Sequence, residues 1–248
     1  MVISHPSAGY RFLAGIAPYS CGVAALPGYE IVRAALRNAL PWRDGFAAID
    51  RFLAERKLPR SALCGIELRC PAPYSMGNFV AFNRQYARVL EEWNLLVDGV
   101  NPLARTNVAP CLDPPTEPQL HGFSAALPAA NAPPTFVIAG AGELRDGRLA
   151  EEGIVRRGEI SAPALAEKAR YVMDVMTERL QALGGDWSLV NQIQVYTRHP
   201  ADDLLRREIE PRIGPAARHG VRWVHARPPV EEIEFEMDLR GTCSELAV

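Results

Sequence analysis

The hydrophobic pattern is most regular late in the chain, in the stretch EEIEFEMDLRG from Glu231 to Gly241. At the two-residue period of a β-strand, its apolar and acidic residues fall on opposite faces. The apolar face holds Ile233, Phe235, Met237 and Leu239, and the acidic face holds Glu232, Glu234, Glu236 and Asp238. The pattern predicts a strand with a buried apolar face. Its acidic row is either a solvated outer face or contains a carboxylate that takes part in chemistry.

A Pro- and Ala-rich stretch, LPAANAPPT, occupies residues 127–135 near the middle of the chain. It has no apolar period and is typical of a linker between domains. The chain of 248 residues is long enough for two units that each bury a core. We therefore predict an N-terminal module over residues 1–127 and a C-terminal module over residues 128–248.

The second half begins with FVIAGAGELRDGRL, which predicts a hairpin with its turn at Asp146-Gly147. A helix is predicted over residues 163–183, because apolar residues recur there at helical spacing. Ser161 is its expected N-cap, and Gly184-Gly185 its expected stop. Strands are predicted in VNQIQVYT, HGVRWVHA and EEIEFEMDL, and a second helix in PADDLLRREIEPRI.

The first half repeats this order of elements. Its predicted strands are RFLAGIA, ALCGIELRC, RTNVAP and LHGFSAAL, and its predicted helices are GFAAIDRFLAERK and GNFVAFNRQYARVLEEW. Ile66 and Ile193 hold the same place in the two patterns. The chain therefore reads as a tandem repeat of ββαβαββ-like units. The expected fold class is α+β, with each unit a mixed sheet that carries its helices on one face.

Composition narrows the expected partners. Hydrophobic residues make up 48% of the chain, charged residues 23%, and the net charge is −2, with no basic block. Nucleic acid is therefore not an expected partner. There is no run of 18 apolar residues and no leader-like pattern at the first residues. We expect no membrane span and a cytoplasmic protein.

Cysteine and histidine spacing gives no sign of a metal centre. The five cysteines are odd in number and lack a CxxC pair, and only His219 and His225 form a near pair of histidines. Two ligands without a third do not make a metal site. The sequence therefore predicts no metal, no disulfide framework and no cofactor.

Five stretches share the spacing of a known family. They are MGNFVAFNRQYARVL and NPLARTNVAP in the first half, and FVIAGAGEL, GPAARHGVRWV and EEIEFEM in the second. Together they resemble the RidA (YjgF) family of enamine/imine deaminases. These stretches are similar to the family's middle helix, its P-A-R-x-x-V strand, its small-Gly strand and its closing glutamate strand. The resemblance implies two tandem RidA-like modules of the chorismate-mutase-like fold. Each half carries only part of the signature, so either the halves complement one another or one of them is scaffold.

Substrates of this family are short enamines or imines with a carboxylate beside the reacting carbon. The resemblance implies that Arg218 is a bidentate clamp for this carboxylate and that Glu236 is the acid/base that handles water. Arg105 and Asn107 are the matching substrate-binding candidates of the first half. Gly140 would allow the substrate to approach the backbone closely, since glycine has no side chain.

The remaining polar residues have plainer expected roles. Three acids are expected to face solvent or to protect a strand edge: Glu232, Glu234 and Asp238. A register shift would instead give the catalytic role to Glu234. Two residues of the middle helix are interpreted as structural: Asn83 and Tyr86. Three tyrosines in loop-like segments are candidates for closing over a ligand: Tyr10, Tyr19 and Tyr74.

Three functions are open at this point. The leading prediction is a metal-free hydrolytic deaminase of a small carboxylated enamine or imine, with an aminomuconate-like intermediate of aromatic breakdown as one candidate. A chorismatase-like enolpyruvyl hydrolase would also use an arginine clamp and a glutamate. A non-catalytic small-carboxylate-binding or scaffold protein would retain only the fold. RidA-like modules assemble about a threefold axis, so we expect a homo-oligomer, with a homotrimer favoured.

Overall fold

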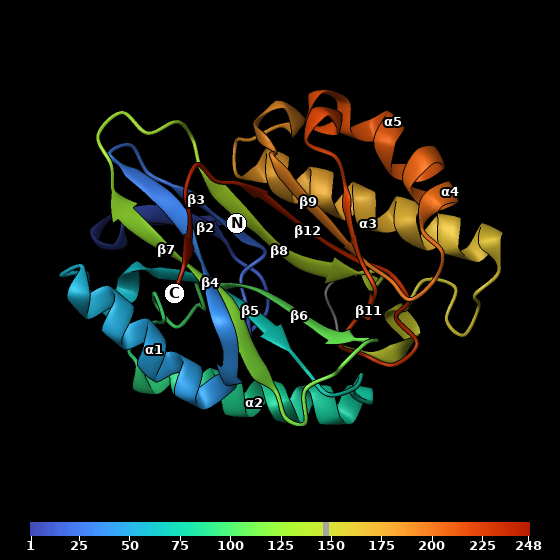
Figure 1. The fold of residues 1–248 in the computed structure, drawn as a ribbon, viewed down its shortest axis with the longest axis horizontal. Helices are drawn as coiled ribbons and strands as arrows, with labels where there is room; N and C mark the ends of the chain where they lie inside the picture. Colours follow the sequence, from blue (N-terminus) through green and yellow to red (C-terminus); the bar gives the residue numbers. More distant parts are fainter. Residues whose placement is uncertain (146–148) are drawn as a thin grey trace.

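A computed structural model describes residues 1–145 and 149–248 of the protein (Figure 1). Its strands form two mixed sheets that face each other in the middle of the molecule, with helices on both outer sides. Helices α1 (Trp42–Glu55) and α2 (Met76–Glu92) lie on one side, and α3 (Ala162–Ala182), α4 (Asp202–Leu204) and α5 (Glu210–Ile213) lie on the other. The predicted α+β class is confirmed. The turn predicted at Asp146-Gly147 falls outside the described residues.

The larger sheet has seven strands among the described residues. In spatial order they are β1 (Val2–His5), β2 (Tyr10–Leu13), β3 (Gly22–Ala25), β8 (Phe136–Gly142), β12 (Glu236–Gly241), β9 (Gln192–Tyr196) and β10 (Arg222–Val224). Only the pair β9–β10 is parallel in this sheet. We call it the seven-stranded sheet.

The smaller sheet has six strands in the described part of the chain. In spatial order they are β11 (Ala226–Arg227), β6 (Ala104–Pro110), β5 (Leu63–Arg69), β7 (Gln119–Pro128), β4 (Tyr29–Pro41) and β13 (Glu245–Ala247). Its central order β6-β5-β7-β4 matches β10-β9-β12-β8 of the seven-stranded sheet. In both, a parallel pair lies beside two antiparallel pairings.

The ends of the chain cross between the sheets. Strand β3 pairs with β8, so that Val23 lies opposite Val137, and strand β13 pairs with β4, so that Leu246 lies opposite Ala34. The predicted boundary at residues 127/128 lies at the end of β7 and before β8. It therefore marks the passage from one sheet to the other. Strands β1, β2 and β3 of the first half nonetheless belong to the seven-stranded sheet, and β13 of the second half belongs to the six-stranded sheet.

The apolar stripe of α3 fixes this helix on the seven-stranded sheet. Val172, Met176 and Leu180 are buried against the apolar face of β12, in a core with Phe235, Met237 and Leu239. The helix extends over residues 162–182, close to the predicted 163–183. The alternation in EEIEFEMDL thus correctly identified which face of this segment enters the helix-covered core.

Two predicted elements are interrupted. The helix expected in PADDLLRREIEPRI consists of α4, a π-helical stretch (Leu205–Ile209) and α5, where Pro211 lacks an N–H for the helical ladder. The strand expected in HGVRWVHA divides after Val224. Its first part, β10, joins the seven-stranded sheet, and its second part, β11, joins the six-stranded sheet.

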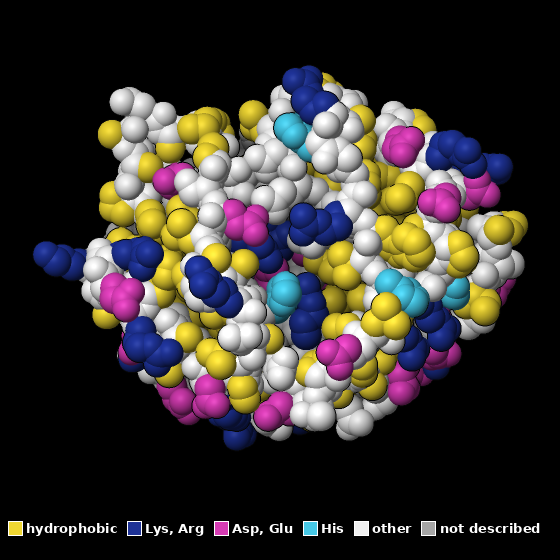
Figure 2. Space-filling model, in the orientation of Figure 1, with side chains coloured by type: hydrophobic (Ala, Val, Ile, Leu, Met, Phe, Trp, Pro, Cys, Tyr) yellow, Lys and Arg dark blue, Asp and Glu magenta, His cyan; other side chains and the backbone are white. Residues whose placement is uncertain are grey.

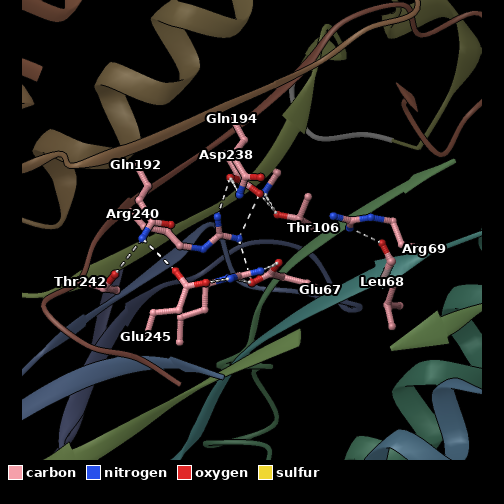
Figure 3. Close-up of polar contacts among 12 residues, drawn as sticks. Glu67, Leu68, Arg69, Thr106, Gln192, Gln194, Asp238, Arg240, Thr242 and Glu245 are labelled. Carbon is pink, nitrogen blue, oxygen red and sulfur yellow. Dashed lines mark hydrogen bonds and ion pairs between the residues drawn. The ribbon is translucent and has the colours of Figure 1, made fainter. Parts of the chain in front are cut away.

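The acidic face of β12 meets the other sheet and not water. Asp238 accepts hydrogen bonds from Thr106 on β6 and from Tyr196 on β9, at 2.8 and 2.9 Å. Arg240 lies between Asp238 and Glu67 on β5, with nitrogen–oxygen distances of 3.1 Å to each (Figure 3). The prediction that Asp238 faces solvent is therefore wrong, because the second face of β12 is covered by the six-stranded sheet.

Candidate functional site

A cavity of about 300 Å³ opens where β6, β8 and β12 approach helix α3. Its lining includes residues from six parts of the chain: Tyr19, Phe79, Arg105, Asn107, Gly140, Ala141, Gly142, Leu144, Leu149, Tyr171, Val175, Glu178, Arg179, Pro229, Val230, Ile233 and Glu236. Four of the five residues that the sequence assigned to a site are in this set. They come from both halves of the chain.

Glu236 is placed by the start of β12, where it pairs with Gly142 of β8 and Tyr196 of β9. Its side chain is 5% exposed. A Cβ atom on Gly140 would lie 2.3 Å from Glu236 Oε1, so the carboxyl occupies the space that this glycine leaves open. Gly140 therefore leaves room for the carboxyl of Glu236 in the cavity wall. The sequence had predicted that this glycine leaves room for the substrate itself.

The segment just before Glu236 is fixed by a buried ion pair. Both carboxylate oxygens of Glu143 accept backbone N–H groups, from Glu234 at 2.7 Å and from Phe235 at 3.0 Å. Lys168 of α3 donates to the same carboxylate at 2.9 Å, and both charged side chains are fully buried. The pair thus holds the chain ahead of β12 against α3 and sets the position of Glu236.

Burial raises the pKa of the Glu236 carboxyl well above its usual range, and the nearby charge of Asp238 raises it further. Arg105 and Arg179 act in the opposite direction. A carboxyl in such a position holds its proton to a higher pH than an exposed glutamate does. It can then donate a proton to a bound molecule and take one back from water.

Arg105 extends from β6 into an aromatic enclosure. It is 4% exposed, its Nη2 donates to Asn83 Oδ1 at 2.7 Å, and its guanidinium carbon lies 4.8 Å from the ring centre of Tyr86 and 5.0 Å from that of Tyr19. Burial lowers the pKa of Arg105, but a guanidinium stays charged at neutral pH. Asn83 and Tyr86, interpreted from sequence as structural, thus orient a charged residue of the cavity.

Arg105 and Asn107 present donors that the protein itself does not use. Among the described residues, Arg105 Nη1 and both polar atoms of the Asn107 amide have no hydrogen-bond partner. The two side chains share one face of β6, and Asn107 is 3% exposed. Buried polar groups are normally paired. Their arrangement suits a carboxylate, which accepts from a guanidinium and an amide at once.

Thr106, between these two residues, connects the cavity to the interior between the sheets. Its hydroxyl accepts from the Gly140 N–H at 3.2 Å and donates to Asp238 at 2.8 Å. The backbone of Gly140, beside Glu236, is thereby tied to the Asp238–Arg240 pair. Figure 3 shows Thr106 reaching Asp238 across the gap between the two sheets.

Arg218, predicted as the clamp, lies elsewhere. It is exposed in the 3-10 helix Gly214–His219, where its Nε donates to the carbonyl of Pro215 at 3.0 Å, and it does not line the cavity. The predicted role rested on the P-A-R-x-x-V pattern, in which the arginine stands on a strand. Here β10 begins only at Arg222, so the structure does not bring Arg218 to Glu236.

Glu234, the alternative in the acidic row, is also accounted for by protein contacts. It is 6% exposed and holds Arg198 at 3.1 Å and His199 at 2.8 Å. The expectation that it faces solvent is wrong, because the loop after β9 covers it. Glu232 does keep a partly exposed side chain, in an ion pair with Arg157.

Of the three tyrosines proposed to close over a ligand, only Tyr19 lines the cavity. Tyr10 is buried between the sheets and donates to the carbonyl of Leu63 at 3.3 Å. Tyr74 stacks on Phe82. Sequence reasoning missed Arg179, although a signal was present: with Lys168, it is one of two cations on the apolar stripe of α3, at helical spacing from Val172 and Met176.

The face of the molecule shown in Figure 2 carries charges of both signs. Its basic and acidic side chains are interspersed, with several basic ones gathered near the centre.

The described residues contain no group of three or more His, Cys, Asp or Glu placed to hold a metal ion. Within the same residues, no helix is long and apolar enough to cross a membrane.

Comparisons with known proteins give these features a context. The family model described as 2-aminomuconate deaminase CnbZ matches residues 2–246. A 2-amino-5-chloromuconate deaminase of Comamonas testosteroni is 37% identical over 240 residues, which cover 96% of this chain and 95% of that protein.

Solved structures show likeness of fold. A chorismatase superposes with a TM-score of 0.53 at 14% identity, over 94% of this chain and 77% of its own. The YjgF gene product of E. coli aligns over 44% of this chain and 80% of its own, at 15% identity and a TM-score of 0.30, which is too low to carry an argument. The likeness to the YjgF product thus extends over only part of the chain.

Proposed function

Since the chain belongs to the 2-aminomuconate deaminase CnbZ family, we propose that it is an enzyme that releases ammonia hydrolytically from an aminomuconate-like substrate. The observation that carries this proposal is a single cavity that combines unused donors on Arg105 and Asn107 with the buried carboxyl of Glu236. These are the two functions that an enamine bearing a carboxylate requires: an anchor and a proton carrier.

Arg105 and Asn107 bind the carboxylate next to the amino-bearing carbon. The fork of a guanidinium fixes both the position and the plane of a carboxylate. Asn83 and the ring of Tyr86 already hold this guanidinium in place, so little order has to be gained on binding. The reacting carbon is thereby brought beside Glu236.

Glu236 then moves protons in both directions. In its protonated form it donates to the enamine carbon, which converts the carbon–carbon double bond next to nitrogen into an iminium ion. A water molecule adds to the iminium carbon while the Glu236 carboxylate accepts one of its protons. That proton is passed to the nitrogen, and the carbon–nitrogen bond breaks as the hydroxyl group of the intermediate gives its proton back to Glu236. Ammonia leaves, a carbonyl group remains, and Glu236 is protonated again. One water is consumed for each ammonia released.

The two halves act in this proposal as RidA-like modules that share one site. The equivalent strand orders β6-β5-β7-β4 and β10-β9-β12-β8 support a tandem repeat. The cavity takes Arg105 and Asn107 from the first half and Gly140 and Glu236 from the second. Metal-free chemistry, the homotrimer and the cytoplasmic location stay predictions.

Ammonia release from 2-aminomuconate by the purified protein tests the proposal. We expect Glu236→Gln to lower turnover by about 10²–10⁴-fold, the usual contribution of a positioned acid or base, while substrate binding survives. Glu232→Gln is the matched control, since this carboxylate is partly exposed and does not line the cavity.

Three results would contradict the proposal in whole or in part. Wild-type protein that releases no ammonia but releases pyruvate from chorismate would identify an enolpyruvyl hydrolase. Saturable binding without release of either product would identify a binding protein. Full activity of the Glu236→Gln variant would remove Glu236 from the mechanism.

A further inference from the structure

The cavity contains a second cation whose charge no carboxylate of the described protein neutralises. Arg179 stands in the last turn of α3 and lines the same cavity as Arg105. Its single hydrogen bond among the described residues runs from Nη1 to the carbonyl of Ala139, at 3.1 Å. It is half-buried and has no ion pair in this part of the chain.

Nearby arginines behave differently. Arg170, on the same helix, pairs with Glu208 at 3.0 Å, and Arg212 pairs with Asp174. Arg170 is exposed, so that its partner contributes little to stability. An enclosed cation without a counter-charge is unfavourable, and a bound anion would offset its cost. Glu178, also at the cavity, is exposed and makes no ion pair with Arg179 among the described contacts.

The two cations belong to elements that contact opposite sides of one peptide group in β8. The peptide group between Ala139 and Gly140 accepts from Arg179 through its oxygen and donates through its nitrogen to Thr106, the neighbour of Arg105 on β6. The oxygen and the N–H of a trans peptide point in opposite directions. Arg179 therefore stands on the α3 side of this peptide, and Arg105 belongs to the β6 side.

The wall of the cavity is apolar in several places. Phe79, Leu144, Val175 and Ile233 line it together with the two arginines. Such a lining suits a short hydrocarbon chain, with polar groups fixing its ends. Both arginines lower the pKa of Glu236, in agreement with positions close to this carboxyl.

We infer that the cavity binds a dicarboxylate by both ends, with Arg105 and Asn107 on the carboxylate beside the reacting carbon and Arg179 on the distal carboxylate. Arg179 is then the residue that selects dicarboxylates over monocarboxylates of the same length. Only the statement about which end reacts rests on the proposed function; the two-ended binding rests on the cavity itself.

Binding of two stable compounds tests this inference without any turnover. The compounds are cis,cis-muconate, a six-carbon diene with a carboxylate at each end, and sorbate, a six-carbon diene with one carboxylate and a methyl group. Isothermal titration calorimetry measures both with wild type, Arg179→Gln and Arg170→Gln. The last variant is the matched control, because it removes one positive charge from the same helix outside the cavity.

We expect wild type to bind muconate at least about 10-fold more tightly than sorbate. Arg179→Gln should weaken muconate binding by about 10–100-fold, as expected for loss of a charged hydrogen-bonding partner, and leave sorbate binding within about 2-fold. Arg170→Gln should change neither. Arg179→Lys keeps the charge and should retain a preference for muconate even if the glutamine variant folds poorly.

The inference is overturned if wild type binds the two compounds equally, or if Arg179→Gln weakens both by the same factor or neither. Because neither compound carries an amino group, failure of ammonia release would reject the proposed reaction and leave this result intact. Conversely, ammonia release without a muconate preference would reject the role of Arg179 and leave the reaction intact.

Discussion

The two sheets share a strand order but contribute different chemistry to the cavity. In the six-stranded sheet, β6 supplies Arg105 and Asn107. At the matching places of β10, reached by counting along its pairing with β9, stand Val221 and Trp223. Val221 packs against the apolar core and Trp223 is exposed. The cationic part of the signature therefore survives in the first half alone.

The acidic residue of the signature, in contrast, is present in the second half and absent from the first. Strand β12 begins at Glu236, opposite Tyr196, the last residue of β9. Strand β7 begins at Gln119, opposite Arg69, the last residue of β5. Gln119 cannot supply an ionisable carboxyl. Each sheet thus supplies a residue type that the other lacks at the matching position. The sequence left open whether the two halves complement one another or one of them is scaffold, and the geometry agrees with the first.

We expect the largest effect on stability from the polar contacts of Asp238 between the two sheets. Asp238→Asn keeps the shape of the side chain but removes the charge that faces Arg240 and accepts from Thr106 and Tyr196. Breaking a buried ion pair from one side typically costs about 3–5 kcal/mol. We expect a fall of this size in the free energy of unfolding, measured by urea denaturation.

The control for this change is Asp50→Asn, which removes an exposed pair with Arg60. Surface pairs contribute about 0–1 kcal/mol, so the loss should be much smaller. Equal losses in the two variants would mean that the sheets are held together by their apolar contacts alone.

The two arginines of the repeated motif test the comparison directly. Arg105→Ala should lower kcat/KM for the aminomuconate by about 10²–10³-fold, because a buried charged partner of the substrate is lost. Arg218→Ala, at an exposed position in the second half, should leave kcat/KM and stability nearly unchanged. A large loss in Arg218→Ala would show that the motif of the second half also serves a site.

Gly140→Ala tests whether position 140 must lack a side chain to make room for the Glu236 carboxyl. The added Cβ would lie 2.3 Å from Glu236 Oε1 and 3.2 Å from the Thr106 side chain, so the carboxyl must move. We expect reduced turnover and a loss of about 1–3 kcal/mol in unfolding free energy from overpacking. In Gly77→Ala, on α2, the new Cβ meets open space and should be neutral or stabilising by up to about 1 kcal/mol.

The pH dependence of stability should be the most gradual of these effects. Glu236 has a folded-state pKa above its ordinary value of 4.5, so the folded protein holds this proton more tightly than the unfolded chain does. Its contribution is complete below about pH 4.5 and is lost as pH rises towards the folded pKa, by at most about 1.4 kcal/mol per pH unit.

Glu236→Gln, which does not titrate, should therefore gain stability relative to wild type as pH rises above about 4.5. Denaturation curves across this range measure the difference. A difference that stays constant with pH would mean that Glu236 titrates normally and does not hold a proton for the reaction.

Sequence patterns correctly predicted those elements whose formation depends on residues near one another in the chain. The stripe of α3 and its flanking residues Ser161 and Gly184 gave that helix almost to the residue, because helical spacing and end signals lie within the segment itself. The resemblance supplied Arg105, Asn107, Gly140 and Glu236. Their meeting in one cavity could not be derived from either half alone.

What failed depended on long-range contacts. Alternation in β12 showed that Asp238 lies opposite the apolar face, but not whether water or a second sheet covers it. Arg218 was misplaced because the segment Gly214–His219 formed a 3-10 helix in place of a strand. Arg179 was missed because a long basic side chain on an apolar stripe commonly reaches solvent at its tip.

The exchange of strands at the two ends has a consequence for the order in which the protein can form during synthesis. Strand β3 finds its partner β8 only after more than a hundred further residues have been made, and β4 receives β13 from the last residues of the described chain. Such distant pairings delay completion of both sheets until the C-terminal part leaves the ribosome. The two halves then become interdependent, so a nick or truncation at either end should unfold the partner half as well.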